Sequence, residues 1–540
     1  MTDRVRPRVR VNQVGYRPGA PKRATWITDA LEPAPFTVRA SSGAVALQGR
    51  SAPWSPRPEP TSGVSVHVLD LTALDTVGDG YRLLVGADRS HPFRIAPDLY
   101  DRLSRDAFRL FYLLRSGCEI DEQRAPGYGR PAGHLGDVAV PCCAELYPGW
   151  RPSGAFDVSG GWYDAGDYGK YVVSGSIALW QLLNLLRLLR RHPAAARAGL
   201  VTESEVVEEC RWQLDWLVRM QVPPGQPYAG MAFHRVHGST WSPMPGFAHE
   251  DPTTRVLHRP STAATLHMAA VAAMGARLLD DDKLLAVART AYRAARAHPD
   301  LIAPDDEGRH GGGPYGDPWL ADDFAWAATE LGLATGSPYA VPPQEFDLDG
   351  FDYDRVGAPA ALDVATATGR LSDDVRAAAE RLLDLQRAQP WGQPYAPATG
   401  WQWGSNGRIL NNLVVLATAH ELTGDRRYRD AVATGVDYLF GRNALGQSYV
   451  TGYGTDATAH LRTRQFGHDL DPSLPPPPPG ALAGGANSVE TAGFPSDPRL
   501  RGLPPQAHYL DEPTSETTND ICIRWNAPLA YVATYLALPH

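Results

Sequence analysis

Hydrophobic and polar positions follow two different periods along this chain. In the first 97 residues, short runs rich in valine, threonine and aromatic residues recur between turn signals, and the run from Val64 to Val68 alternates with a period of two. Such alternation is typical of half-buried strands. Six or seven strands are expected here, over residues 9–11, 24–27, 36–38, 64–69, 81–85 and 92–95. The pattern predicts a small all-β sandwich at residues 1–97.

From residue 98 to residue 540 the apolar positions recur with the period of an α-helix, and no comparable strand runs follow. Three helices end in a Thr-Gly pair, at residues 335–336, 368–369 and 423–424, because glycine readily takes the left-handed conformation that stops a helix. About a dozen antiparallel helices predict a toroid of paired helices or a solenoid. The expected helices cover residues 98–116, 170–190, 203–220, 261–280, 283–297, 321–335, 356–368, 373–388, 407–423, 426–440 and 524–537.

Several connections between these helices are long and rich in glycine, proline and aromatic residues. They cover residues 118–169, 223–260, 300–320, 390–406 and 441–523. Long structured loops on a helical scaffold usually build a functional site. We therefore look for chemistry in these five segments.

Composition excludes several classes of protein. The chain has 540 residues, of which 43% are hydrophobic and 21% charged, so it has enough apolar surface to fold. A net charge of −9 excludes a general nucleic-acid binder. The most apolar stretch, residues 172–189, is interrupted by Ser174, Gln181 and Arg187, which favours a buried helix over a membrane span.

Cysteine usage and the N-terminus bear on the compartment. The five cysteines are sparse and irregularly spaced, so no disulfide framework is expected. The basic stretch at residues 1–13 lacks the apolar segment of a signal peptide. The expectation is a cytoplasmic protein.

The densest group of candidate catalytic residues lies between residues 157 and 171, where four glycines surround two carboxylates. Asp164 and Asp167 are three residues apart, directly before a very apolar helix. Such a pair can hold a water molecule, with one carboxylate as general base and the other as its positioning partner. The alternative is that these residues cap the following helix.

Two further segments carry candidate chemistry. His460 and Arg462 are two residues apart in a long loop, where both can point into one cleft and donate to sugar hydroxyls or to a carboxylate. Residues 511–520 form an acidic, polar loop that runs into an apolar helix. A carboxylic acid held there against Ile521 and Trp525 would have a raised pKa, while helix capping by this loop is the alternative.

Two carboxylate groups far apart in sequence, within a helical toroid with aromatic loops, suggest glycoside hydrolysis. Aromatic residues of these loops would stack on sugar faces, with packing as the alternative for each of them. The candidates are Trp162, Tyr163, Trp401, Trp403 and Tyr453.

The chain resembles glycoside hydrolase family 9, in the group whose members have an N-terminal immunoglobulin-like domain. The resemblance spans nearly the whole chain. It rests on Val11-Asn12-Gln13-Val14-Gly15-Tyr16, on residues 157–171, on residues 441–454 followed by His460-x-Arg462, and on residues 519–527, with supporting segments at 311–317 and 403–406.

The resemblance implies an (α/α)6 barrel at residues 98–540, preceded by an immunoglobulin-like sandwich, and an inverting mechanism. It implies Asp167 as the base and Asp164 as its partner. It also implies His460 and Arg462 as the substrate-side pair and Asp511 as a substrate-binding residue. In such a mechanism the two carboxyls stand ~6.5–9.5 Å apart to admit the attacking water.

One position departs from the family pattern. The family has glutamate at the acid position, whereas Asp520 stands there in Thr518-Asn519-Asp520. Aspartate is one methylene shorter, and a misplacement of about 1 Å can cost ~100-fold in rate. Three outcomes are open: the backbone has moved to compensate, Glu516 has taken over, or the protein acts on another substrate or no longer hydrolyses.

The resemblance also bears on metals. Relatives often bind calcium after the segment 311–317, and Asp322, Asp323 and Asp354 are the candidate oxygen ligands, with solvated helix starts as the alternative. Some relatives hold zinc with cysteine and histidine between the two domains. Cys118 and His134 match that site, but Gly133 stands where a second cysteine is expected, so zinc is not expected unless residues 142–143 substitute.

The sequence thus predicts an inverting glycoside hydrolase for β-linked gluco-oligosaccharides, with catalytic Asp167, Asp164 and Asp520. The partner is an oligosaccharide or a glycosylated small molecule, without nucleic acid, membrane or organic cofactor, and the protein is a monomer or homodimer. The alternatives are an exo-β-glucosaminidase, in which Asp511 reads a cationic amino group, and a catalytically altered family member.

Overall fold

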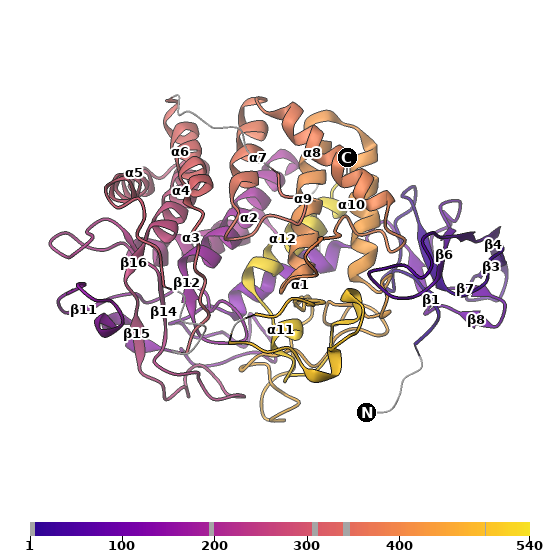
Figure 1. Ribbon diagram of the computed structural model, residues 1–540, viewed down its shortest axis with the longest axis horizontal. Coiled ribbons are helices and arrows are strands. Elements are labelled where there is room, and N and C mark those ends of the chain that lie inside the picture. The colour runs from indigo at the N-terminus through magenta and orange to yellow at the C-terminus, as the bar shows by residue number, and fades with distance from the viewer. Residues whose placement is uncertain (1–5, 194–198, 305–310, 338–345, 492, 540) are drawn as a thin grey trace.

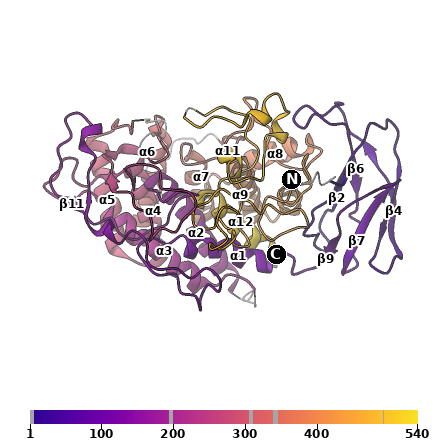
Figure 2. The ribbon, with the colours of Figure 1, turned by 90° about the horizontal axis from the view of Figure 1, so that it is seen from below.

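The computed structural model describes residues 6–193, 199–304, 311–337, 346–491 and 493–539. It consists of a β-sandwich at one end of the molecule and a larger helical body (Figures 1 and 2). Parts of the basic N-terminal stretch and of the 300–320 connection lie outside the described residues. The predicted fold class, a mainly helical domain preceded by an immunoglobulin-like sandwich, is confirmed.

The sandwich is built from two antiparallel sheets, with strand orders β1-β2-β6-β5 and β4-β3-β7-β8, and β9 also pairs with β7. Its core lies between them and includes Val38, Leu69, Leu83 and Ile95, all shielded from solvent. The strands are β1 (Val9–Arg10), β2 (Arg23–Ile27), β3 (Pro35–Arg39), β4 (Val45–Arg50), β5 (Ala52–Pro53), β6 (Val66–Asp70), β7 (Gly78–Val85), β8 (Asp88–Arg89) and β9 (Phe93–Ile95).

Three of these strands, β4, β5 and β8, were not expected from the sequence. β4 lies at the edge of its sheet and is mostly exposed, so it buries no regular apolar face that a sequence pattern would reveal. β5 and β8 have two residues each, too few to show a period.

Six inner helices form a closed ring, in which each helix packs against the next in the order α2, α4, α6, α7, α9 and α12. Their sequences are apolar on nearly all sides, as expected for helices surrounded by protein. They are α2 (Val172–Arg191), α4 (Thr262–Leu279), α6 (Leu320–Thr335), α7 (Gly357–Thr368), α9 (Ser405–Thr423) and α12 (Ile523–Ala537).

Five outer helices pack on this ring, and each has one buried face. In α5, for example, Leu284, Ala288, Ala291 and Ala295 are buried at helical spacing while the other face is solvated. The outer helices are α1 (Asp101–Leu113), α3 (Glu203–Arg219), α5 (Asp282–Ala297), α8 (Ser372–Arg387) and α10 (Arg426–Leu439), and a short helix, α11 (Glu516–Asn519), precedes α12.

Helices α2 and α4 are long and apolar enough to cross a membrane by length and composition. Both belong to the inner ring, and 89% and 83% of their apolar windows are buried inside the protein. Their hydrophobic character is explained by this packing, as the sequence analysis expected for residues 172–189.

The sandwich is joined to the helical body by buried polar contacts. The amide of Gln13 donates to the carbonyl of Phe440 over 2.9 Å, and the side-chain amide of Asn12 donates to Asp437 over 2.9 Å. Burial raises the pKa of Asp437 to about 7. The run 11–16, on which the resemblance partly rests, therefore lies at the domain interface.

Short strands, which the sequence did not reveal, organise the loops at one end of the ring. β12 (Lys170–Tyr171), β14 (Arg235–Gly238) and β15 (Arg255–Leu257) form a three-stranded sheet directly before α2 and α4. Their side chains and those of the segments before α6, α7, α9 and α12 meet at the N-terminal ends of the inner helices.

Candidate active site

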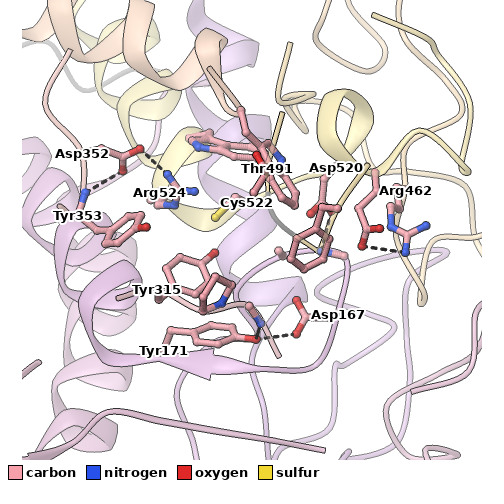
Figure 3. A pocket seen from close by; sticks show the side chains of 18 of the residues that line it. Asp167, Tyr171, Tyr315, Asp352, Tyr353, Arg462, Thr491, Asp520, Cys522 and Arg524 are labelled. Atoms are coloured by element: carbon pink, nitrogen blue, oxygen red, sulfur yellow. Dashed lines mark hydrogen bonds and ion pairs between the residues drawn. The ribbon is translucent and has the colours of Figure 1, made fainter. Parts of the chain in front are cut away.

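A cavity of about 280 Å³ lies at this end of the ring (Figure 3). Its lining comes from segments that precede five of the inner helices: Asp167 before α2, Tyr315 before α6, Asp352 before α7, Trp403 before α9 and Asp520 before α12. Helix N-termini favour negative charge, which suits a site rich in carboxylates.

Asp167 faces this cavity. Its Oδ2 accepts hydrogen bonds from the amide of Gly169 over 2.8 Å and from the hydroxyl of Tyr171 over 3.2 Å. Tyr171 is held by β12 and also receives a hydrogen bond from the amide of Gly313 over 2.9 Å. The carboxylate therefore has a defined orientation, as a general base requires.

Asp164 lies behind Asp167 and is fully shielded from solvent. Its two oxygens accept hydrogen bonds from the hydroxyls of Ser174 and Tyr315, and the thiol of Cys522 lies 3.6 Å away. Burial raises the pKa of Asp164 to about 6, and the two hydroxyls partly offset that rise. Asp164 is not among the described residues that line the cavity.

Asp520 also faces the cavity, at the end of α11. Its Oδ1 accepts hydrogen bonds from the amide of Gly166 over 3.1 Å and from the amide of Ile521 over 2.9 Å. Burial raises the pKa of Asp520 well above its usual value, Arg462 opposes the rise and Asp167 adds to it. A carboxyl group whose pKa is raised keeps its proton to higher pH than usual, which suits a general acid.

Backbone pairing brings the two candidate catalytic segments together. Ala165 forms a bridge with Cys522, and Arg462 forms one with Asp520. The approach is so close that a Cβ atom at Gly166 would stand 2.4 Å from the carbonyl oxygen of Arg462 and 2.6 Å from Oδ1 of Asp520. Glycine is therefore required at position 166.

Glu516, the alternative acid, lies one helical turn before Asp520 and lines the same cavity. Its carboxylate is engaged with Arg462, whose Nη2 donates to Oε1 over 3.0 Å. Figure 3 draws this ion pair at Arg462, on the same side of the cavity as Asp520, and the charge of Arg462 also acts on Asp520.

His460 and Asp511 do not line the cavity. Asp511 accepts hydrogen bonds from the amides of Ala459 and His460 and from the hydroxyl of Thr458, so it shapes the loop that carries Arg462. His460 is half exposed; burial lowers its pKa, but the hydrogen bond with Asp469 reverses the effect and leaves the pKa raised. Their contact with substrate stays a prediction.

The structure corrects the expectation that Tyr163 and Trp401 stack on sugars. Tyr163 has no exposed surface, and its hydroxyl forms a hydrogen bond of 2.7 Å with Nδ1 of His134. Trp401 is buried against Tyr395 and Tyr438. Both are packing residues, because a sugar cannot reach a buried ring. The aromatic residues that line the cavity are Tyr171, Trp241, Tyr315, Tyr353, Trp403, Phe494 and Trp525.

A charged group that the sequence analysis missed lines the side of the cavity away from Arg462 (Figure 3). Arg524 donates to Asp352 over 2.5 Å, and Arg408 lies 3.7 Å from the same carboxylate. Burial alone would raise the pKa of Asp352, but these two arginines keep it below its usual value. Arg524 lies within the stretch 519–527, and only its partner in a distant loop, Asp352, reveals the pair.

The expected calcium ligands are only partly brought together. In the described residues the group of side chains that could hold a metal ion is His267, Asp317 and Asp323, whose ligand atoms lie within 4.8 Å of one another. Asp322 instead accepts a hydrogen bond from the amide of Val356, and Asp354 lies 3.8 Å from Arg408. Both residues nevertheless lie near the group, since the charges of Asp322 and Asp354 act on the buried carboxylate of Asp323.

The chemistry of this group fits a cation. His267 Nε2 and Asp323 Oδ1 are 2.9 Å apart without hydrogen-bond geometry, and Asp317 Oδ2 and both oxygens of Asp323 are buried without partners among the described residues. Burial and the nearby Asp323 raise the pKa of Asp317 to about 8. A divalent cation would satisfy all of these atoms.

The zinc site of some relatives does not fit this chain. His134 is engaged by Tyr163 and by Asp251, which lies 3.1 Å from its Nε2. A Cβ atom at Gly133 would stand 2.5 Å from that of Ala248, so the second cysteine of that site would not fit at position 133 without a shift. Cys143 donates to the carbonyl of Leu257 rather than turning toward His134.

Comparison with known proteins agrees with this architecture. The profile described as glycosyl hydrolase family 9 matches residues 100–533, and that of the cellulase N-terminal ig-like domain matches residues 4–90. The chain is similar to endoglucanase C of Cellulomonas fimi, with 45% identity over 98% of this chain and 52% of that protein. It is also similar to cellulose 1,4-beta-cellobiosidase of Acetivibrio thermocellus, with 36% identity over 98% of this chain and 67% of that protein.

Among solved structures, the family 9 glycoside hydrolase of Bacteroides ovatus superimposes with a TM-score of 0.84 and 26% identity, covering 98% of both chains. The chain spans about half the length of the endoglucanase and two thirds of the cellobiosidase. By these matches the chain belongs to glycosyl hydrolase family 9 and carries the cellulase-type immunoglobulin-like domain at its N-terminus.

Proposed function

We propose that the protein is an inverting glycoside hydrolase that cleaves β-1,4-linked gluco-oligosaccharides. One observation carries this proposal. Asp167 and Asp520 both face one cavity, and the backbone segments beside them pair directly. The names of the two similar proteins, an endoglucanase and a 1,4-beta-cellobiosidase, support the glucan substrate.

In the proposed reaction Asp167 accepts a proton from a water molecule, which attacks the anomeric carbon. Asp520 gives its proton to the glycosidic oxygen as the bond to the leaving sugar breaks. Asp164 lies behind the base and, with Ser174 and Tyr315, fixes the loop that carries it. Arg462 stands close enough to Asp520 to offset the negative charge left after proton transfer.

The shorter acid is compensated by backbone position in this proposal. The bridge from Arg462 to Asp520 and the hydrogen bond from Gly166 draw the acid segment against the base loop. Glu516 is less suited to the role because its carboxylate is already held in an ion pair with Arg462.

The glucosaminidase alternative receives no support from Asp511. Its oxygens are engaged by backbone amides and by Thr458, and it does not line the cavity. Four arginines and five acidic side chains line the cavity, so the lining charges do not single out a cationic sugar. The arginines are Arg408, Arg462, Arg464 and Arg524, and the acids are Asp167, Asp352, Asp354, Glu516 and Asp520.

The test is a chromatographic time course with cellotetraose, using the wild type and the variants Asp167→Asn, Asp520→Asn and Glu516→Gln. We expect hydrolysis by the wild type, loss of at least about 1,000-fold in the two aspartate variants, and a much smaller loss in Glu516→Gln. Retention of activity in Asp520→Asn, with loss in Glu516→Gln, would reassign the acid. Absence of hydrolysis by the wild type would reject the proposal.

For the metal group we propose one divalent cation bound by His267, Asp317 and Asp323. An imidazole nitrogen with carboxylates suits zinc or manganese better than calcium, which takes oxygen ligands. This cation would be structural, since it holds the start of α6 against α4, close to the segment that carries Tyr315.

A further inference from the structure

Three aromatic rings form a continuous arch along the cavity. Trp241 and Phe494 meet edge to face with ring centroids 6.2 Å apart, and Phe494 and Trp403 meet likewise at 5.3 Å. All three line the cavity. We call Trp241, Phe494 and Trp403 the aromatic arch.

The arch crosses the end of the ring of helices from one side to the other. Trp241 lies in the connection that leads to α4, whereas Trp403 lies directly before α9. In the order α2, α4, α6, α7, α9 and α12, helices α4 and α9 are three steps apart, which places them opposite each other. Phe494, only 6% exposed, joins the two sides.

Hydrogen bonds hold both ends of the arch. On one side, the amide of Ser488 donates to the carbonyl of Trp401 over 2.8 Å and the amide of Trp401 donates to Oγ of Ser488 over 2.9 Å. On the other, Nε of Arg464 donates to the carbonyl of Ser242 over 3.0 Å. The arch is therefore a built part of the site.

The side of the cavity away from Arg462 is suited to bind free hydroxyl groups. Asp352, Asp354, Arg408 and Arg524 line it, and Arg524 also stacks near Tyr353, 5.2 Å from the ring centroid. Asp354 Oδ1 and the Nε atoms of both arginines are buried without hydrogen-bond partners among the described residues, although Asp354 Oδ1 lies 3.8 Å from Nη2 of Arg408. An unpaired buried polar group is unfavourable, so this part of the wall gains from ligand hydroxyls or water.

The end of a glucan chain differs from its interior in two ways that the cavity wall and the aromatic arch can distinguish. It carries one more free hydroxyl, and no further sugar follows it. A cavity of about 280 Å³ lies at the small end of ligand sites, and the arch limits passage across it. An internal segment of a long glucan would need to run past the arch in both directions.

We propose that the site binds the end of a glucan chain, so that the enzyme releases short units from chain ends, and that Phe494 is the residue that enforces this specificity. The inference rests on the proposed hydrolase function and names its mode of action. Without Phe494 the arch is interrupted, and internal segments gain access to the same Asp167 and Asp520.

The test compares the fall in viscosity of carboxymethyl cellulose per new reducing end with the kcat/KM for cellotetraose. Internal cuts lower viscosity steeply, whereas cuts at chain ends hardly change it. We expect a small fall for the wild type and a fall at least about tenfold larger per bond for Phe494→Ala, with cellotetraose still hydrolysed at a measurable rate. Trp241→Ala, which opens the arch from the other side, serves as the second variant.

Phe247→Ala is the matched control, because Phe247 lies in the same loop as Trp241 but does not line the cavity. It should behave as the wild type does. A steep fall for the wild type, or an unchanged ratio in both arch variants while cellotetraose is hydrolysed, would overturn the chain-end inference alone. Failure of the wild type to hydrolyse cellotetraose would instead reject the hydrolase function and this inference with it.

Discussion

The amide of Gly166 donates a hydrogen bond to Oδ1 of Asp520 over 3.1 Å, so the candidate acid is tied to the residue that directly precedes the candidate base. The two residues are 354 positions apart in the chain. In the proposed mechanism this contact holds the acid segment against the base loop, so that an aspartate acts where the family has glutamate.

Replacing Gly166 by alanine should therefore damage catalysis more than stability. The new methyl group would meet the carbonyl of Arg462 and the carboxyl of Asp520, and it would push the two catalytic segments apart. We expect kcat on cellotetraose to fall by about 100-fold, the usual effect of a misplacement near 1 Å. Gly136→Ala is the control, because a Cβ there meets nothing within 4 Å. Equal activity of both variants would contradict the close approach.

The acid limb of the pH profile of kcat/KM should reflect the raised pKa of Asp164. Burial raises that pKa to about 6, and the hydroxyl of Ser174 stabilises the charged form. Removing the donor in Ser174→Ala raises the pKa further, so the acid limb should move to higher pH by about one unit. Ser176→Ala, on the same helix, should leave the limb in place. An acid limb that does not move in Ser174→Ala would show that the charge of Asp164 is not required.

A buried ion cluster beneath the base loop should contribute strongly to stability. Asp137 lies 2.7 Å from Lys170 and 3.0 Å from Arg255, and none of the three is solvated. Asp137→Asn leaves two cations buried together, which should cost about 3–5 kcal/mol and lower Tm by several degrees. Calorimetry against the exposed Asp29→Asn variant measures this; a similar Tm for both would refute the role of the cluster.

The pKa of Asp137 also sets a direction for acid denaturation. Burial opposes its charge, but Arg255 and Lys170 hold its pKa well below the usual value. Its folded-state pKa is lower than its unfolded one, so its contribution is present above the unfolded pKa and is lost as the pH falls through the folded value. The Tm difference between wild type and Asp137→Asn should shrink below about pH 4.

Metal removal should destabilise the protein through His267, Asp317 and Asp323. We expect about one equivalent of a divalent transition metal by elemental analysis, and a loss of about 2–3 kcal/mol on chelation if the ion is held at 100-fold above its Kd. His267→Ala should lose the metal and should no longer respond to chelator in thermal unfolding. The control is His249→Ala, which lies outside the group. A wild type that contains no metal, and whose thermal unfolding does not change with chelator, would contradict a metal site at these residues.

The fold could largely be read from the sequence, because long helices carry a strong period and Thr-Gly stops. The site could be read only where a dense local motif exists, as around Asp164 and Asp167. Tyr163 and Trp401 were misassigned because an aromatic residue in a glycine-rich loop looks the same whether it faces sugar or core. Phe494 and Arg524 were missed because their partners, Trp241 and Asp352, come from loops more than 150 residues away.

The most direct test of the account is the anomeric form of the first product, followed by proton NMR as the wild type hydrolyses cellotetraose. Attack by a water held at Asp167, with protonation by Asp520, inverts the anomeric carbon, so the α-anomer should appear first and equilibrate later. Asp167→Asn and Asp520→Asn should show no early product. Initial release of the β-anomer, or release by either variant at the wild-type rate, would contradict the assignment of these two residues.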